Sequence, residues 1–430
     1  MRPPMSSSEV TAAFDRPYRP TAIAIANRVG RLLSGVGIGA KPITVNDVLS
    51  DARRKTGLSD FGDEGFLEPL EVLADSINRE AALNPVGHMI IRGRIVGVLR
   101  NKLVAQDNIK RHPEILDIPV EAPIIVAGLA RTGTTMLHRL IAQDPGIRSL
   151  ASWEAINPAP SKPTGGRKRD PRFAQAAAAA KGLKYMSPGF FAIHPAEPDA
   201  PEEEVILLEQ AFLTTTPEAM MNVPTYSKWL EVQDHVPAYQ ALKRMMQYLQ
   251  WQRPGIGKDV RWVLKTPHHQ EYFDPLLEVF PDATIVHTHR DPLKTSPSLF
   301  SMLTYLQMIF SDDVDPHRVA SHWLAKIENM ARRTMATRER LNDEGFVDVS
   351  YYDLIKDPMP EVERIYEAAG AFLPADARKA MESSRQDNKQ HKYGRHKYAL
   401  ADFGMTEDDV ESRIAPYRAR FKVPYEQETR

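Results

Sequence analysis

The sequence predicts an α/β fold in which helices flank a parallel sheet, with an all-helical N-terminal extension and a helical insert. Short apolar runs with β-branched residues occur at four points, residues 124–127, 260–264, 283–289 and 346–352. Segments with helical periodicity lie between these runs, and only helical periodicity precedes residue 120. Strands that alternate with helices form parallel sheets, which bind ligands at the carboxyl ends of their strands.

Composition limits the classes of protein that the chain could represent. The 430 residues carry 55 Lys and Arg against 56 Asp and Glu, a net charge of −1, so no basic field favours nucleic acid. The absence of cysteine excludes disulfides, thiolate metal sites and a cysteine nucleophile. No apolar stretch is long enough to span a membrane, and the polar, proline-rich start lacks the apolar segment of a signal peptide. We therefore expect a soluble, cytoplasmic protein.

The N-terminal part divides into a flexible arm over residues 1–20 and a helical extension over residues 21–120. Its first helix, 21–36, places four apolar residues near one face, with Arg28 and Arg31 between them: Ile25, Val29, Leu32 and Leu33. Such a face could touch a membrane surface, but with so few basic residues we favour a helix packed against the domain.

Two longer helices are predicted over residues 64–83 and 87–109, because leucine and isoleucine recur there at helical spacing. A proline-rich connector over residues 111–123 follows them. The remaining chain, 121–430, should form the α/β domain, with an apolar and aromatic helical insert over about residues 160–255.

A phosphate-binding loop is the most informative motif. Residues 123–143 read PIIVAGLARTGTTMLHRLIAQ, which predicts a buried strand, a glycine-containing turn and a helix without a gap. Glycines let the backbone curl, and the free N–H groups of the helix start favour an anion. The spacing matches the P-loop pattern GxxxxGK[ST] except that Thr134 stands at the lysine position, which argues against a nucleoside triphosphate. The alternative is a strand–turn–helix without a ligand.

Two motifs carry a resemblance to a known family. GLARTGTT resembles the loop that binds the 5′-phosphosulfate of PAPS (3′-phosphoadenylyl sulfate) in sulfotransferases. Downstream, the strand before Arg290-Asp291-Pro292, with Ser298 eight residues after Arg290, resembles the element that binds the 3′-phosphate in this family. Over roughly residues 123–357 the chain is thus similar to PAPS-dependent sulfotransferases, in particular to the bacterial branch that resembles tyrosylprotein sulfotransferases.

The resemblance implies transfer of a sulfuryl group from PAPS to a hydroxyl or amine of a small or lipid-like acceptor. Adenosine 3′,5′-bisphosphate would be the product, no metal is expected, and the insert would wall the acceptor site. It also implies a set of donor-binding residues: Arg131, Thr132, Gly133, Thr134, Thr135, Arg290 and Ser298. The oligomeric state stays open, a homo-oligomer included.

Sulfuryl transfer needs a cation near the leaving oxygen and a base for the acceptor proton, by analogy with phosphoryl transfer. Arg131 is the first candidate cation. Lys265 is the second, because it ends the predicted strand over 260–264 and resembles the Lys-x-Pro element of tyrosylprotein sulfotransferases. The alternative for Lys265 is a surface lysine.

The identity of the base stays open between two residues. Glu154 follows Trp153 and resembles the glutamate base of tyrosylprotein sulfotransferases, although a small insertion separates it from the pattern. His269, with His268 beside it, resembles the Lys-Thr-His element of cytosolic sulfotransferases, at a longer spacing. His194 is a weaker candidate. A basic, aromatic cluster over residues 391–398 could close on the 3′-phosphate or form a solvated loop.

Two other functions compete with the sulfotransferase interpretation. A P-loop nucleotide kinase or other phosphotransferase is disfavoured by the missing lysine at Thr134 and by the pair Arg290 and Ser298. A non-catalytic nucleotide-binding protein is disfavoured by the joint presence of Arg131 and Lys265 with that pair. The identity of the acceptor has no readable code in the sequence.

Overall fold

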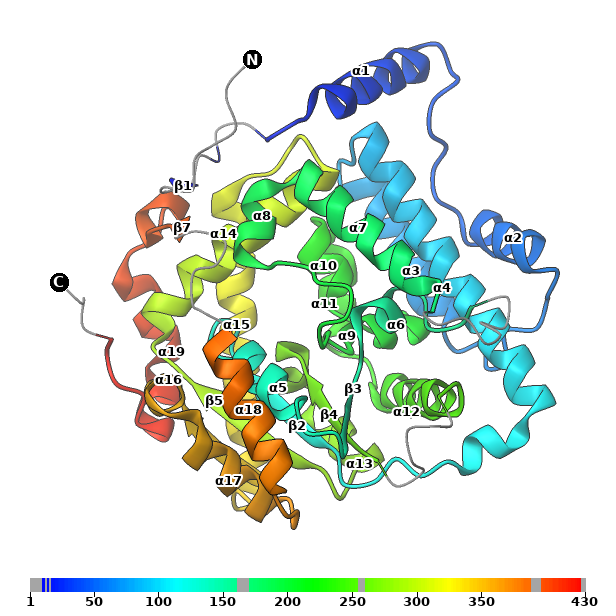
Figure 1. Ribbon diagram of the computed structural model, residues 1–430. Coiled ribbons are helices and arrows are strands. Elements are labelled where there is room, and N and C mark those ends of the chain that lie inside the picture. Colours follow the sequence, from blue (N-terminus) through cyan, green and yellow to red (C-terminus); the bar gives the residue numbers. More distant parts are fainter. Residues whose placement is uncertain are drawn as a thin grey trace.

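The computed structural model in Figure 1 describes residues 10, 11, 14, 17–160, 170–253, 260–387 and 396–426. It confirms the predicted α/β class. Five parallel strands form one sheet in the order β3-β4-β2-β5-β6, and helices cover the sheet. The strands are β2 (Ile124–Gly128), β3 (Ile147–Ser149), β4 (Arg261–Lys265), β5 (Thr284–His289) and β6 (Phe346–Ser350).

Four of the five strands were predicted from the sequence. The edge strand β3 was not, because three residues after a turn are too short to show a period. Sheet register decides where the functional residues lie. Val126 of β2 pairs with Lys265, and Gly128 pairs with Thr288 of β5, so the strands end at one common edge.

Apolar packing on the two faces of the sheet explains its position in the core. One face, which carries Val126, Val263 and Val286, packs on helices α5 (Thr134–Ile141), α17 (Pro358–Ala368) and α18 (Ala375–Asp387). The other face joins a larger core with α12 (Val236–Trp251) and α13 (Phe273–Val279). A third apolar cluster holds α14 (Pro292–Phe310), α15 (Pro316–Arg340) and α19 (Glu407–Phe421) together.

The N-terminal extension is all helical, as predicted. It comprises α1 (Thr21–Gly35), α2 (Val45–Thr56), α3 (Leu67–Glu80), α4 (Pro85–Arg111) and the 3-10 helix η1 (Pro113–Asp117). Val48, Leu70 and Leu99 belong to the same apolar core as Leu264 of the sheet. The extension therefore shares its core with the α/β part.

The first helix does not pack as expected. The four apolar residues predicted near one face of α1 are exposed, and Asn27 is its one buried residue, so the helix packs against the domain through the opposite, polar face. Of the arm predicted over residues 1–20, Val10–Thr11 (β1) pairs with His396–Lys397 (β7) in a separate two-stranded sheet. The ring of Phe14 lies 5.2 Å from the rings of both Tyr305 and Phe403. The other described residues of the arm are 17–20.

Helices make up most of the described part of the insert. They are α7 (Arg172–Met186), α8 (Pro188–Ile193), α9 (Val205–Leu208), the 3-10 helix η2 (Glu209–Ala211), α10 (Thr216–Met220), α11 (Pro224–Leu230) and α12, and α6 (Ser152–Ile156) precedes them. Within the described ranges of the chain, no helix combines the length and apolar character needed to cross a bilayer.

Candidate active site

The loop between β2 and α5 has the backbone of an anion cradle. Arg131 and Gly133 adopt φ angles of 73° and 93°, so the chain curls twice through the left-handed region. A Cβ on Gly128 would lie 2.1 Å from the Thr288 hydroxyl, so only glycine fits there. Helix α5 begins at Thr134 without a side-chain cap on its N–H groups. Uncapped N–H groups at a helix start favour a bound anion.

The threonine side chains of the loop divide into structural and available hydroxyls. Thr132 is buried, and its hydroxyl donates to the Leu129 carbonyl at 2.7 Å and lies 2.6 Å from the hydroxyl of Thr288. This side chain fastens the loop to β5. Thr134 is also buried, whereas Thr135 is exposed. Thr135 is therefore the threonine whose hydroxyl can meet a ligand.

Lys265 reaches this hydroxyl from the neighbouring strand. Its Nζ lies 3.4 Å from Thr135 Oγ1 and forms an ion pair with Glu203, which lies just before α9. Lys265 is only 3% exposed, which excludes the alternative of a surface lysine. Burial alone would raise the pKa of Glu203, but the charge of Lys265 and the hydrogen bonds of Lys265 and Thr266 outweigh burial and lower it, so this carboxylate is ionised near neutral pH.

His194 and Arg131 complete a group of ionisable side chains at the loop. The Arg131 guanidinium donates to the Ile193 carbonyl at 3.4 Å, next to His194. Burial lowers the pKa of His194, and the charges of Lys265 and Arg131 add to this effect against Glu203, so the imidazole is neutral near pH 7. We call Arg131, Thr135, His194, Glu203 and Lys265 the cradle cluster.

Glu154, one of the two predicted bases, has other partners. Its side chain is fully buried; Oε1 lies 3.1 Å from an Arg148 amino group, and Oε2 accepts the Ala151 N–H at 3.2 Å. Arg148 belongs to β3 and stacks on the ring of Trp262 in β4. The structure thus uses Glu154 to tie α6 to the sheet edge, and its contacts do not include the cradle cluster.

His269, the other predicted base, has hydrogen-bond partners at both ring nitrogens. Its Nε2 lies 2.5 Å from Glu204 Oε1, and its Nδ1 lies 2.8 Å from the Tyr239 hydroxyl. Glu204 in turn accepts the backbone N–H of Lys265 at 2.8 Å. His268 is buried too, with Nδ1 3.1 Å from the hydroxyl of Thr215. These side chains support Lys265 through its backbone.

Arg290 lies on the other side of the loop. Its guanidinium donates a hydrogen bond to the Arg131 carbonyl at 3.3 Å. The guanidinium carbon also lies 4.0 Å from the centroid of the Tyr351 ring, over its face. Two further bonds of 2.9 Å join it to the carboxylate of Glu426 near the C-terminus. Ser298 is buried on α14, and its hydroxyl has no hydrogen-bond partner among the described residues. A buried orphan hydroxyl of this kind suits a ligand oxygen.

The predicted basic cluster over residues 391–398 falls mostly outside the described residues. Tyr398, its last member, lies within electrostatic reach of both Arg131 and Arg290. Positions 391–395 are not among the described residues, and only the backbone of 396 and 397 is described.

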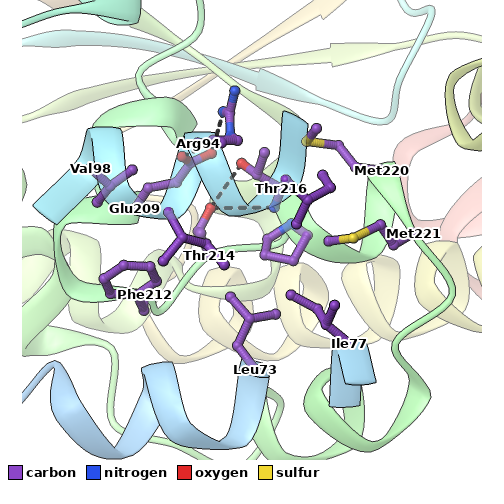
Figure 2. Close-up of a pocket in the computed structure, with 13 residues that line it drawn as sticks. Leu73, Ile77, Arg94, Val98, Glu209, Phe212, Thr214, Thr216, Met220 and Met221 are labelled. Atoms are coloured by element: carbon purple, nitrogen blue, oxygen red, sulfur yellow. Dashed lines mark hydrogen bonds and ion pairs between the residues drawn. The ribbon is translucent and has the colours of Figure 1, made fainter. Parts of the chain in front are cut away.

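A small apolar cavity of about 30 Å³ lies between the extension and the insert (Figure 2). The ion pair of Arg94 with Glu209 and the hydroxyls of Thr214 and Thr216 supply its few polar groups. Thr214 also donates to the Val205 carbonyl at 3.1 Å, beside Glu204. Its lining is otherwise apolar: Leu73, Ile77, Ile91, Ile95, Val98, Phe212, Pro217, Met220 and Met221.

One cluster of metal-ligand side chains occurs among the described residues. His287, His289 and Asp348 bring their ligand atoms within 4.8 Å of one another. The guanidinium of Arg338 lies 3.1 Å from His287 and 2.5 Å from Asp348, so a side-chain cation already fills this cluster.

Comparisons with known proteins give the family. A sequence model described as the sulfotransferase family matches residues 123–374, more than half of the chain. The chain belongs to the sulfotransferase family. The match begins one residue before β2 and includes the loop, Lys265 and Arg290.

Relatives of this sulfotransferase occur in mycobacteria. The chain is 27% identical over 262 residues to the omega-hydroxy-beta-dihydromenaquinone-9 sulfotransferases Stf3 of Mycobacterium bovis and Mycobacterium tuberculosis. That match covers 58% of this chain and 63% of the relatives' length.

Two solved structures are similar over most of the chain. Sulfotransferase STF1 of M. tuberculosis H37Rv has 32% identity and a TM-score of 0.76, covering 87% of this chain and 99% of STF1. STF9 of Mycobacterium avium has 29% identity and a TM-score of 0.80, covering 90% and 98%.

Sequence reasoning missed two carboxylates at the site. Glu203 lies in a run of three glutamates that is visible in the sequence, but it is far from Lys265 along the chain. Glu426 lies near the C-terminus, where nothing marks it as a partner of Arg290. Only the folding of the insert and of the C-terminal segment brings them to the loop.

Proposed function

We propose that this sulfotransferase moves the sulfuryl group of PAPS to a hydroxyl group of a lipid-like acceptor. The observation that carries the proposal is the placement of cations on both sides of one phosphate loop. Lys265 reaches Thr135 from β4, while Arg290 reaches the Arg131 carbonyl from beyond β5. A ligand with a charged group at each end of an adenosine matches this spacing of charge.

The residues at the loop fit such a donor. The curled backbone and uncapped start of α5 suit the 5′-phosphosulfate, together with the side chains of Arg131 and Thr135 and the backbone at Thr132, Gly133 and Thr134. Arg290 and the orphan hydroxyl of Ser298 suit the 3′-phosphate. Tyr351, beneath the Arg290 guanidinium, would hold this side chain in place.

Different residues of the cradle cluster would have different roles in the reaction. PAPS supplies the sulfuryl group, whose bond to the bridging oxygen breaks as the bond to the acceptor oxygen forms. Lys265 and Arg131 would stabilise the negative charge that develops on the leaving bisphosphate. Glu203 would take the proton from the acceptor hydroxyl, because its ionised carboxylate lies at Lys265. We therefore propose Glu203 as the base in place of Glu154 or His269.

The names of two relatives support an apolar acceptor. The Stf3 relatives are named for a hydroxylated dihydromenaquinone.

Binding of the product nucleotide provides the first test. Adenosine 3′,5′-bisphosphate at about 100 times its Kd should stabilise the folded chain by about 2.7 kcal/mol, which a thermal-shift assay detects. Labelled sulfate should then pass from PAPS to hydroxylated lipids. Stabilisation by ATP with Mg²⁺, without any by the bisphosphate, would instead favour the nucleotide kinase.

A substitution at the strand end tests the catalytic assignment. Lys265→Met should lower kcat by about 10²–10³, because a preorganised cation at the leaving group is lost. Lys228→Met removes an exposed lysine on α11 and is the matched control, with kcat expected to stay at the wild-type value. Equal kcat values for the two variants would remove Lys265 from catalysis.

A further inference from the structure

Helix α1 presents its apolar side chains to solvent. Ile25, Val29, Leu32 and Leu33 are 58, 49, 67 and 42% exposed, and Val36 and Ile38 in the following turn are exposed as well. Their positions i, i+4, i+7 and i+8 form one continuous stripe along the helix. In Figure 1, α1 lies at the upper margin of the molecule and projects from it. We call these six side chains the α1 stripe.

The opposite face of α1 attaches the helix to the body. Asn27 is buried, and its Oδ1 accepts the N–H of Val86 at 2.9 Å. Gly30 approaches Pro85 so closely that a Cβ would lie 2.4 Å from the proline Cβ. Arg31 pairs with Asp312 at 3.0 Å. These contacts fix the rotation of the helix, so the stripe faces outward because of specific packing.

This orientation is the reverse of that of an ordinary surface helix, which buries its apolar face. A contiguous exposed apolar surface on a globular protein marks a site that something else covers. The charge of the segment indicates what that partner is. Residues 17–46 contain Arg19, Arg28, Arg31 and Lys41 but no aspartate or glutamate.

A second copy of the chain would be a poor partner for this stripe. It would bring the same cations to the contact without a carboxylate from this segment. Asp312 already pairs with Arg19 and Arg31, whereas Arg28 and Lys41 of the same segment are exposed. An anionic lipid surface offers both negative charge and an apolar layer.

We propose that α1 docks this protein on an anionic membrane surface, with the α1 stripe inserted at the boundary of headgroups and acyl chains. Arg28 and Lys41 would lie at the headgroups. One short helix gives weak, reversible binding rather than a permanent anchor. The proposal goes beyond the proposed function and does not depend on it, because docking needs neither donor nor acceptor.

Vesicle co-sedimentation of the full chain tests the proposal. The wild-type chain should sediment with vesicles of phosphatidylcholine and phosphatidylglycerol, less with pure phosphatidylcholine, and less at high salt. The double variant Val29→Asp/Leu32→Asp should lower the partition coefficient by at least about tenfold, because two carboxylates would enter the apolar layer. Val232→Asp, at an exposed valine far from α1 in the sequence, is the matched control with unchanged binding.

A charge reversal separates the two components of binding. Arg28→Glu should weaken binding to anionic vesicles several-fold, whereas Lys228→Glu on α11 should not. Thermal melts establish that all variants are folded. Absence of wild-type binding, or equal binding by the double variant, would overturn the proposal. So would a wild-type oligomer, detected by light scattering, that the double variant converts to monomer without any vesicle binding.

Discussion

The partners of a carboxylate decide whether it can act as a base. Glu154 bonds Arg148 and the Ala151 N–H with its two oxygens, inside the core. Glu203 faces Lys265, and its side chain is 21% exposed, so an acceptor hydroxyl can approach it. The two glutamates look alike as sequence letters, and only their contacts distinguish them.

Substitution by glutamine separates the two roles. Glu203→Gln should lower kcat by about 10²–10⁴ and leave the Kd of adenosine 3′,5′-bisphosphate close to that of the wild type. Glu154→Gln should instead lower the free energy of unfolding by about 3–5 kcal/mol, since it leaves Arg148 buried without its charge partner. Urea unfolding and steady-state kinetics measure both. Normal turnover by Glu203→Gln would show that Glu203 is not the base and that another residue takes the acceptor proton.

The carboxylate of Glu426 contacts Arg290, the residue proposed to bind the 3′-phosphate of the donor. Glu426 makes a bidentate pair with Arg290, and its N–H donates to Asp291 at 2.7 Å. A donor phosphate would compete with this carboxylate for the same guanidinium. Glu426→Gln should therefore lower the Kd of the bisphosphate by about threefold to tenfold in calorimetric titration.

The control for this effect is Glu411→Gln, which removes a carboxylate that pairs with Arg418 in the same C-terminal region. Its Kd should equal that of the wild type. Arg290→Ala should weaken binding. An unchanged or higher Kd for Glu426→Gln would show that the carboxylate does not compete with the ligand.

At the scale of elements, α15 carries a buried lysine between carboxylates from other segments. Lys326 Nζ lies 3.1 Å from Glu218 of α10 and 3.0 Å from Glu271 after β4, and all three are almost fully buried. Burial raises the pKa of Glu271 to about 7, against the effect of Lys326. Lys326 and His322 outweigh burial at Glu218 and lower its pKa to about 2. One of the carboxyls therefore holds a proton in mildly acidic solution.

This raised pKa gives the stability a predictable pH dependence. Between pH 4.5, the ordinary pKa of the unfolded residue, and about pH 7, the folded state holds a proton that the unfolded state has released. Stability should thus fall as the pH rises through this range, by on the order of 3 kcal/mol from Glu271. Glu271→Gln should remove this part of the fall between pH 5 and pH 8 in urea unfolding, whereas Glu231→Gln, a more exposed partner of Lys326, should keep it. The same fall in Glu271→Gln as in the wild type would contradict the assignment.

At the scale of the whole molecule, the sheet brings the ends of four chain segments together. β2 leads into the loop, β4 ends at Lys265, β5 is followed by Arg290, and β6 is followed by Tyr351. Parallel pairing places all four at one edge, as in other α/β folds with ligands there. The N-terminal extension stabilises this arrangement, because its helices belong to the same large apolar core as one face of the sheet.

Docking through α1 would suit a lipid acceptor, since it would hold the whole molecule at the surface where such an acceptor lies. The α1 stripe and the cradle cluster are separate parts of the protein. The variant Val29→Asp/Leu32→Asp should therefore lose vesicle binding but keep normal turnover on a short, water-soluble acceptor.

The sequence by itself determined the α/β class, four of the five strands, the phosphate loop and the family, because these depend on local patterns. Apolar runs, glycine positions and the Arg290 motif can be read within one segment each. Tertiary structure alone decided which polar residues meet: Glu203 at Lys265, Glu426 at Arg290, and Glu154 at Arg148. It also decided that α1 turns its apolar face outward, since Gly30 packs closely on Pro85 and Asn27 accepts the N–H of Val86. Residues far apart in the chain acquire partners only through packing, and no linear spacing encodes that contact.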